Sequence, residues 1–112
     1  MKCTVSETGK LGQRVVESLL LKNGYCCIQP NVRKGKYEFD IIANKGGTRA
    51  IFEVRTTTKS RLPFEIFPPL KILTVLAGAH QYYPSAVVIF VHVLYQLQNV
   101  TKISWYSSQD LL

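Results

Sequence analysis

Two carboxylates lie inside stretches of sequence that otherwise resemble buried strands. Asp40 falls within residues 37–43 and Glu53 within residues 49–55, and both stretches are dominated by Ile, Phe, Val and Ala. Carboxylates rarely enter a protein core unless a partner compensates the loss of their hydration. The two acidic residues are therefore the first candidates for a functional site.

The segment between the two stretches predicts how these carboxylates are placed. It reads NKGG, and Gly46-Gly47 suits a two-residue hairpin turn with positive φ angles. If the turn is centred between the two glycines, Asp40 and Glu53 stand opposite each other with Cβ atoms roughly 5 Å apart. Side chains alternate along a strand, so Arg55 lies on the same face as Glu53.

Two carboxylates at this separation repel each other unless a cation or a proton joins them. Mg²⁺ suits such a pair because it prefers hard oxygen ligands and keeps bound waters, and it can polarise a phosphodiester. A second interpretation is a structural cluster in which Arg55 or another base neutralises both acids. The spacing of Asp40, Glu53 and Arg55 leaves both interpretations open.

The rest of the chain supplies the elements that must hold the pair, and its 112 residues suit a single domain over 1–112. The apolar periodicity and the turn residues predict an αβββαβ order with a final strand, an α/β sheet with helices packed against it. The expected elements are a helix over 9–23, strands over 25–30, 37–43 and 49–55, a helix over 68–82, and strands over 85–93 and 101–107.

Several residues set the expected limits of these elements. Thr8 or Ser6 is expected to cap the first helix, and Gly24 fits the position just after its end. Pro30 is expected to stop the first strand, so that residues 31–36 form a basic loop.

The motifs "EFDIIA…IFEVR", preceded by "GQRVVESLLLKNGY" and "QPNVRKGKYEFD", resemble the PD-(D/E)XK nuclease superfamily and, within it, the archaeal Holliday junction resolvases. The resemblance covers residues 9 to about 57. It implies a restriction-endonuclease-like αβββαβ core with a mixed central sheet flanked by helices. It also implies that Asp40 and Glu53 bind Mg²⁺ or Mn²⁺, with Val54 at the variable position, and that the protein acts as a homodimer on DNA.

The sequence departs from the resolvase pattern at two catalytic positions. Arg55 stands where the family usually has a lysine; it keeps the charge but does not readily release a proton. Gln13 stands where resolvases usually carry a glutamate on the first helix, and it can hold a water without supplying charge. Glu17, one turn later, could take over the acid role, although an exposed helix position is the alternative for it.

The charge distribution points to an anionic partner. The net charge is +7, and twelve of the fourteen Lys and Arg residues lie within residues 1–61. Such a surface suits a phosphate backbone, with solvated surface charge as the alternative. The loop residues expected to contact DNA phosphates are Arg33, Lys34, Lys36, Lys59 and Arg61.

Other features narrow the class of protein. The three cysteines include no CxxC motif, so they suggest neither zinc nor a disulfide framework, and an intracellular, cytoplasmic protein with reduced thiols is expected. The N-terminus does not resemble a signal peptide, and the apolar run 85–95 is too short to span a membrane. His92, inside that run, is expected to be a hydrogen-bonded core residue.

The sequence thus predicts a magnesium-dependent DNA endonuclease of the Holliday junction resolvase kind. The alternative is a catalytically impaired protein of the same fold that binds DNA or serves in an assembly. A nuclease with another target, such as RNA, is a third possibility. The expected dimer interface uses residues of the uncharged half of the chain: Ile66, Phe67, Leu70, Val75, Tyr82 and Tyr83.

Overall fold

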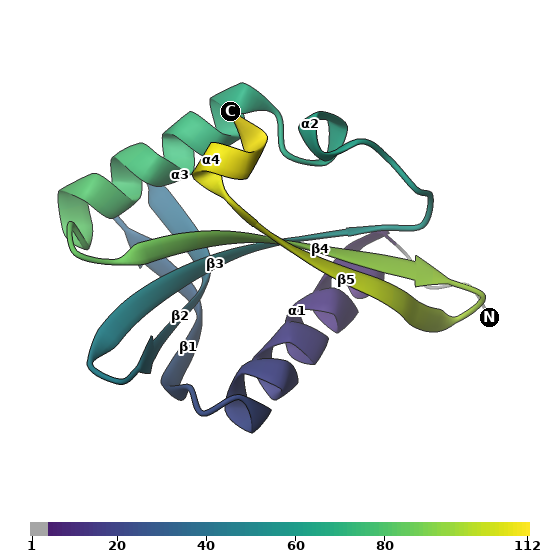
Figure 1. The fold of residues 1–112 in the computed structure, drawn as a ribbon, viewed down its shortest axis with the longest axis horizontal. Helices are drawn as coiled ribbons and strands as arrows, with labels where there is room; N and C mark the ends of the chain where they lie inside the picture. Colours follow the sequence, from purple (N-terminus) through teal and green to yellow (C-terminus); the bar gives the residue numbers. More distant parts are fainter. Residues whose placement is uncertain (1–4) are drawn as a thin grey trace.

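Five strands form one mixed sheet in the order β1-β2-β3-β4-β5, with helices on both faces (Figure 1). The computed structural model describes residues 5–112. The strands are β1 (Cys26–Lys34), β2 (Tyr37–Lys45), β3 (Thr48–Thr57), β4 (Val87–Gln96) and β5 (Asn99–Ser107). The helices are α1 (Val5–Lys22), α2 (Pro63–Ile66), α3 (Pro69–Tyr82) and α4 (Ser108–Leu111).

Helix α1 covers one face of the sheet, and α3 covers the other (Figure 1). Strands β3 and β4 are parallel, and the chain crosses between them through α2 and α3, while the other neighbouring strands are antiparallel. The predicted α/β class with a mixed sheet flanked by helices is therefore confirmed. The short helices α2 and α4 were not predicted. Within residues 5–112, no helix is long and apolar enough to cross a membrane.

The apolar residues form a core layer on each face of the sheet. The layer on the α1 face includes Val16, Leu20, Ile41, Phe52, Val91 and Val93. The layers under α3 include Ile66, Phe67, Ile72, Val75 and Phe90 in one cluster, and Phe39, Ile42, Ile51 and Ala79 in another. Gly78 allows α3 to approach β2 closely. A Cβ atom added at this position would lie 2.7 Å from the Tyr37 ring.

The two ends of α1 compare differently with prediction. The helix extends to Val5, the first residue that the structure describes, so Ser6 and Thr8 lie within it and the predicted start at Gly9 is too late. At the other end Gly24 has a φ of 87°, the Gly24 N–H donates to the Leu21 carbonyl, and the Tyr25 N–H donates to the Leu20 carbonyl. These two bonds form the predicted glycine C-terminal cap.

Strand β1 runs through Pro30 to Lys34, so the predicted end at Pro30 is wrong. The strand lies at the edge of the sheet, where the missing proline N–H leaves no unpaired partner. Its ladder with β2 is irregular between Cys26 and Gln29, and Asn31 has a φ of 53°. Residues 31–34, expected in a loop, therefore belong to the sheet.

Candidate functional site

The β2–β3 hairpin brings Asp40 and Glu53 together as predicted. Its turn is Gly46-Gly47, with φ angles of 56° and 80°, and its regular register pairs Lys45 with Thr48 and continues to Ile41 with Phe52. The next positions along this register are Asp40 and Glu53. The regular backbone ladder stops there, and the two carboxylates begin.

At this point side chains replace the backbone ladder. The Asp40 N–H donates to Glu53 Oε1 at 3.2 Å, and the Val54 N–H donates to Asp40 Oδ2 at 2.8 Å. Each carboxylate thus bonds to the backbone of the opposite strand. These bonds fix both side chains without neutralising their charge, which leaves the remaining oxygens able to bind a cation.

The surroundings of the pair disfavour two negative charges. Glu53 is only 4% exposed. Burial, and after it the neighbouring Asp40, raise its pKa to about 8 against the opposing effect of Lys71. Burial also raises the pKa of Asp40, while the hydrogen bond from Val54 opposes the shift. At neutral pH the pair therefore retains a proton or binds a cation.

Lys71 is the cation that the sequence analysis did not place at the site. Its Nζ lies 3.9 Å from Glu53 Oε2, on the first turns of α3 above the sheet. One feature of the sequence could have pointed to Lys71. It is the only Asp, Glu, Lys or Arg residue between Glu65 and Lys102. A lone charge on an otherwise apolar helix face is a candidate partner for a buried acid.

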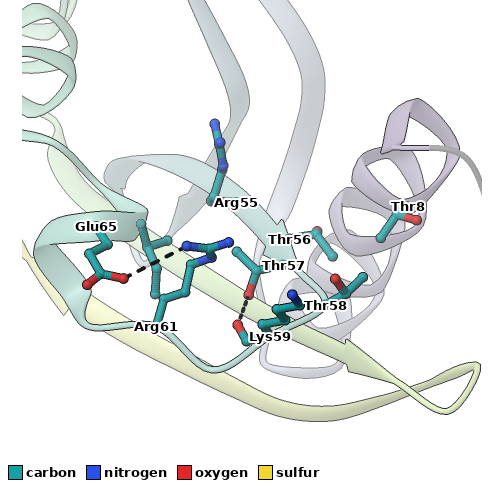
Figure 2. Close-up of a pocket in the computed structure, with 9 residues that line it drawn as sticks. Thr8, Arg55, Thr56, Thr57, Thr58, Lys59, Arg61 and Glu65 are labelled. Carbon is teal, nitrogen blue, oxygen red and sulfur yellow. Dashed lines mark hydrogen bonds and ion pairs between the residues drawn. The ribbon is translucent and has the colours of Figure 1, made fainter.

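Arg55 does not make the contact that a neutralising role requires. The structural interpretation allowed Arg55 or another base as the partner of the acids, and the base that pairs with Glu53 is Lys71. Arg55 is exposed, and it borders a pocket formed where the chain leaves β3. Figure 2 shows its side chain extending away from Lys59 and Arg61, which border the same pocket.

Gln13 reaches the site through the backbone. Its Nε2 lies within donating distance of the Asp40 carbonyl, at 3.1 Å, and of Asn31 Oδ1, at 3.2 Å. The amide therefore ties α1 to β1 and β2 beside the carboxylates. Gln13 and Glu17 both line a groove of about 500 Å³ between α1 and β1, together with Lys10 and Pro30. Glu17 makes no hydrogen bond or ion pair to Asp40 or Glu53.

The predicted phosphate-binding residues fall into two separate groups. Arg33, Lys34 and Lys36 lie at the end of β1 and in the turn before β2, where Arg33 pairs with Glu38 at 3.4 Å. Lys36 lies over the Tyr37 ring, 5.4 Å from its centroid. The second group comprises Lys59 and Arg61, which follow β3 and line the pocket of Figure 2.

Two further expectations meet the structure with opposite results. His92 is 6% exposed and its Nε2 lies 2.7 Å from Thr57 Oγ1, so the predicted core histidine is confirmed.

The predicted dimer interface is wrong for Ile66, Phe67 and Val75, because all three are buried in the core under α3. Apolar periodicity does not tell a core-facing helix position from an interface position.

The donor set fits a hard divalent cation with an incomplete protein shell. Within residues 5–112, no group of three or more His, Cys, Asp or Glu side chains gathers around one point. Asp40 and Glu53 supply two adjacent carboxylates, and burial raises the pKa of both, so a bound cation would favour their ionised forms. Mg²⁺ tolerates one or two carboxylates with waters or phosphate oxygens completing its shell.

The fold of this chain is similar to that of Hjc, a Holliday junction resolvase from Archaeoglobus fulgidus. The two structures match with a TM-score of 0.65 at 17% sequence identity, over 90% of this chain and 78% of that chain. The resemblance to the nuclease superfamily drawn from the sequence motifs is thus confirmed at the level of the fold.

Sequence relatives define the family. The UPF0102 protein BF0634 of Bacteroides fragilis is 36% identical over 76 residues, which are 66% of this chain and 63% of that relative's length. A UPF0102 protein of Alkaliphilus metalliredigens is 46% identical over 48 residues, 43% of this chain and 42% of that protein. The model of the "Uncharacterised protein family UPF0102" matches residues 12–102. The chain with this resolvase-like fold and its facing carboxylates belongs to the UPF0102 family.

Proposed function

We propose that this protein is a nuclease that hydrolyses phosphodiester bonds in DNA with the aid of Mg²⁺ or Mn²⁺. The observation that carries the proposal is the pair of facing carboxylates at the open end of the β2–β3 hairpin, the half-buried Asp40 and the buried Glu53. Their high pKa values reflect a site that favours additional positive charge. The fold shared with the resolvase Hjc supports the same choice of reaction.

Asp40 and Glu53 would hold the ion, and the ion would supply a Lewis acid that lowers the pKa of an attacking water. Lys71 lies beside Glu53 and offsets part of the negative charge on the carboxylates. Arg55 would contact a phosphate with its guanidinium, a role that needs charge and not proton release. Gln13 holds α1 against the Asp40 backbone and so positions the ligand strand.

A DNA-binding protein without cleavage activity is the second candidate. Two observations favour it: Arg55 occupies the usual lysine position, and Gln13 bonds to backbone and amide groups instead of adding a third carboxylate. The basic half of the chain would serve that function equally well. A homodimer, for which a four-way junction offers two symmetric cuts, and an intracellular setting remain part of the proposal.

The test uses labelled four-way junction, duplex and single-stranded DNA, each with Mg²⁺, Mn²⁺ or EDTA. Wild-type protein is expected to cleave at least one substrate with a divalent ion and none with EDTA. Loss of an outer partner of a metal costs about 10–100-fold, so Asp40→Asn, which removes a ligand, should reduce cleavage by at least about 100-fold. DNA binding by Asp40→Asn should stay near the wild-type level.

Glu38→Gln is the matched control, because Glu38 is an exposed acid on the same strand with Arg33 as its partner. It should leave cleavage within about twofold of wild type, since no metal ligand is touched. Cleavage by Asp40→Asn at the wild-type rate would remove Asp40 from the metal site. Binding without cleavage by the wild type, with every ion and substrate, would select the second candidate.

A further inference from the structure

A polar pocket of about 340 Å³ lies where the chain leaves β3 and turns toward α2 (Figure 2). Its lining joins three parts of the fold: the end of β3 with the loop after it, Thr8 on α1, and Glu65 on α2. Hydroxyl groups and cations dominate this lining. The residues that bear on ligand binding are Thr57, Thr58, Lys59, Arg61 and Glu65.

Thr57 fixes the loop by a hydrogen-bond chain that begins in the core. Its hydroxyl donates to the Lys59 carbonyl at 2.9 Å, and it lies 2.7 Å from His92 Nε2 on β4. A hydroxyl has one proton to donate, so its oxygen accepts from His92, which carries its proton on Nε2. His92 is a positioning residue that holds the turn from Thr57 to Lys59 in one conformation.

The charges in the pocket leave a net positive balance. Lys59 and Arg61 contribute two cations against Glu65, and the Arg61–Glu65 pair is long, at 4.0 Å, with both side chains about half exposed. An exposed ion pair of this kind is weak, so Arg61 can turn to another anion. With Arg55, which also lines the pocket, three cations stand against one carboxylate, and this balance of two positive charges suits a phosphate group.

Thr58 places an exposed hydroxyl on the loop after β3. Thr56 also lines the pocket, but its Oγ1 is buried against Gly12 of α1 and is not accessible to a ligand. Hydroxyl groups together with Lys and Arg are the donors that proteins commonly use for phosphate oxygens.

We propose that this pocket binds a phosphate group of the nucleic acid, next to the phosphate cleaved at Asp40 and Glu53. The proposal rests on the proposed function for its ligand, and it gives the site a second anchor point on the substrate strand. The phosphate is either an internal phosphodiester or a terminal phosphomonoester. Both carry negative charge and present the oxygen acceptors that the hydroxyl groups and cations of the pocket can bind.

The first experiment measures phosphate binding in EDTA, so that it does not depend on cleavage. Amide NMR signals of Thr57, Thr58, Lys59 and Arg61 are followed as inorganic phosphate replaces chloride at constant ionic strength. Saturable shifts of these signals are expected in the wild type and not in Lys59→Gln/Arg61→Gln. The matched double variant Lys22→Gln/Arg49→Gln removes the same charge elsewhere and should retain the shifts.

The second experiment measures the affinity for a single-stranded oligonucleotide of about six nucleotides, with and without a 5′-phosphate, again in EDTA. Lys59→Gln/Arg61→Gln should weaken binding about tenfold and reduce the salt slope by about 0.7 for each lost contact. Tighter wild-type binding of the 5′-phosphorylated strand would identify a terminal phosphomonoester as the ligand. Equal affinity for both strands would identify an internal phosphodiester.

Thr57→Val tests the positioning by His92. The hydroxyl contacts His92 and Lys59, so its loss should weaken oligonucleotide binding several-fold and shift the His92 Nε2 resonance. Thr74→Val is the control, because Thr74 only donates to the Leu70 carbonyl on α3. Absent phosphate shifts, together with wild-type affinity in Lys59→Gln/Arg61→Gln, would overturn the pocket. Cleavage that survives this result would leave the proposed nuclease intact.

Discussion

The two ends of the β2–β3 hairpin are held together in different ways. At the turn end the backbones pair regularly from Lys45 and Thr48 onward, and Gly46-Gly47 supplies the positive φ angles that the tight turn requires. At the open end the carboxylates of Asp40 and Glu53 accept hydrogen bonds from the opposite backbone. Backbone pairing therefore joins the strands at the turn end, and hydrogen bonds from backbone N–H groups to carboxylates join them at the open end.

This difference separates stability from function within one hairpin. A backbone ladder stabilises the strands without burying ionised groups, whereas two desolvated carboxylates destabilise them unless a proton or a cation is bound. Functional sites commonly keep such unfavourable groups because the reaction needs them. The open end is therefore expected to respond to pH, to metal ions and to nearby charges, and the turn end to backbone conformation alone.

Glu53→Gln should give the largest change in stability. The pKa of Glu53 is about 8 in the folded protein against 4.5 as its ordinary value. Between these pH values the folded state binds more protons than the unfolded state, so stability falls as pH rises through about 8. The difference corresponds to at most about 5 kcal/mol. Glutamine cannot ionise, so the variant should melt several degrees above wild type at pH 9 in EDTA.

Thermal melts of both proteins between pH 5 and pH 9 measure this effect. Near pH 5 the two melting temperatures should be close, because Glu53 is then protonated in the folded wild type. Glu38→Gln is the control on the neighbouring strand β2, since Glu38 is exposed. Parallel pH profiles for wild type and Glu53→Gln would contradict a buried, high-pKa carboxyl at this position.

Lys71→Met should have a smaller effect of the opposite sign. Lys71 offsets the charge on Glu53 across 3.9 Å, but its side chain is 57% exposed, so solvent screens the interaction. A loss of about 1 kcal/mol or less is expected at pH 8. Lys71 interacts favourably only with ionised Glu53. The loss of stability should therefore shrink toward pH 5, where Glu53 is protonated in the folded protein.

Melting temperatures with and without Mg²⁺ separate this role from simple packing. Added Mg²⁺ should restore the stability of Lys71→Met if the ion binds beside Glu53 and replaces the lost charge. Lys71→Arg should behave nearly as wild type, and Lys22→Met, an exposed change on α1, should show no dependence on Mg²⁺. A loss that is the same at pH 5 and pH 8 would show that only the aliphatic part of Lys71 matters.

The two ends of the hairpin also differ in how much the sequence could predict. Gly46-Gly47 fixes the turn, the turn fixes the register, and the register places Asp40 opposite Glu53. This chain of inference is local, so it needs no knowledge of the rest of the fold. His92 was predictable for a similar reason, because a polar residue inside an apolar strand needs a hydrogen-bond partner.

The features that escaped prediction depend on contacts between distant segments. Lys71 reaches Glu53 only because α3 crosses the sheet at that point. Strand β1 continues past Pro30 because it lies at the edge, which depends on the strand order. Phe67, directly after α2, and Val75, on α3, pack into the core, and their sequence pattern would suit an interface equally well.

Gly46→Asn should give the smallest change, and it tests the turn end by itself. Asparagine tolerates the left-handed conformation better than other residues with a side chain, and Asn-Gly is favoured in two-residue hairpin turns. With the Gly46 φ of 56°, and with no atom within 4 Å of an added Cβ, the variant should change stability by only a few tenths of a kcal/mol.

Gly46→Val provides the contrast, because a β-branched residue at this φ costs about 1–2 kcal/mol with no change in the space around it. Both variants should show the wild-type dependence on pH and on Mg²⁺, since neither touches the carboxylates at the other end of the hairpin. Thermal melts at pH 5 and pH 9 measure this directly. A pH-dependent loss in Gly46→Asn would mean that the two ends are coupled, because a slip in the turn would then displace Asp40 from Glu53 and disturb their hydrogen bonds to the backbone.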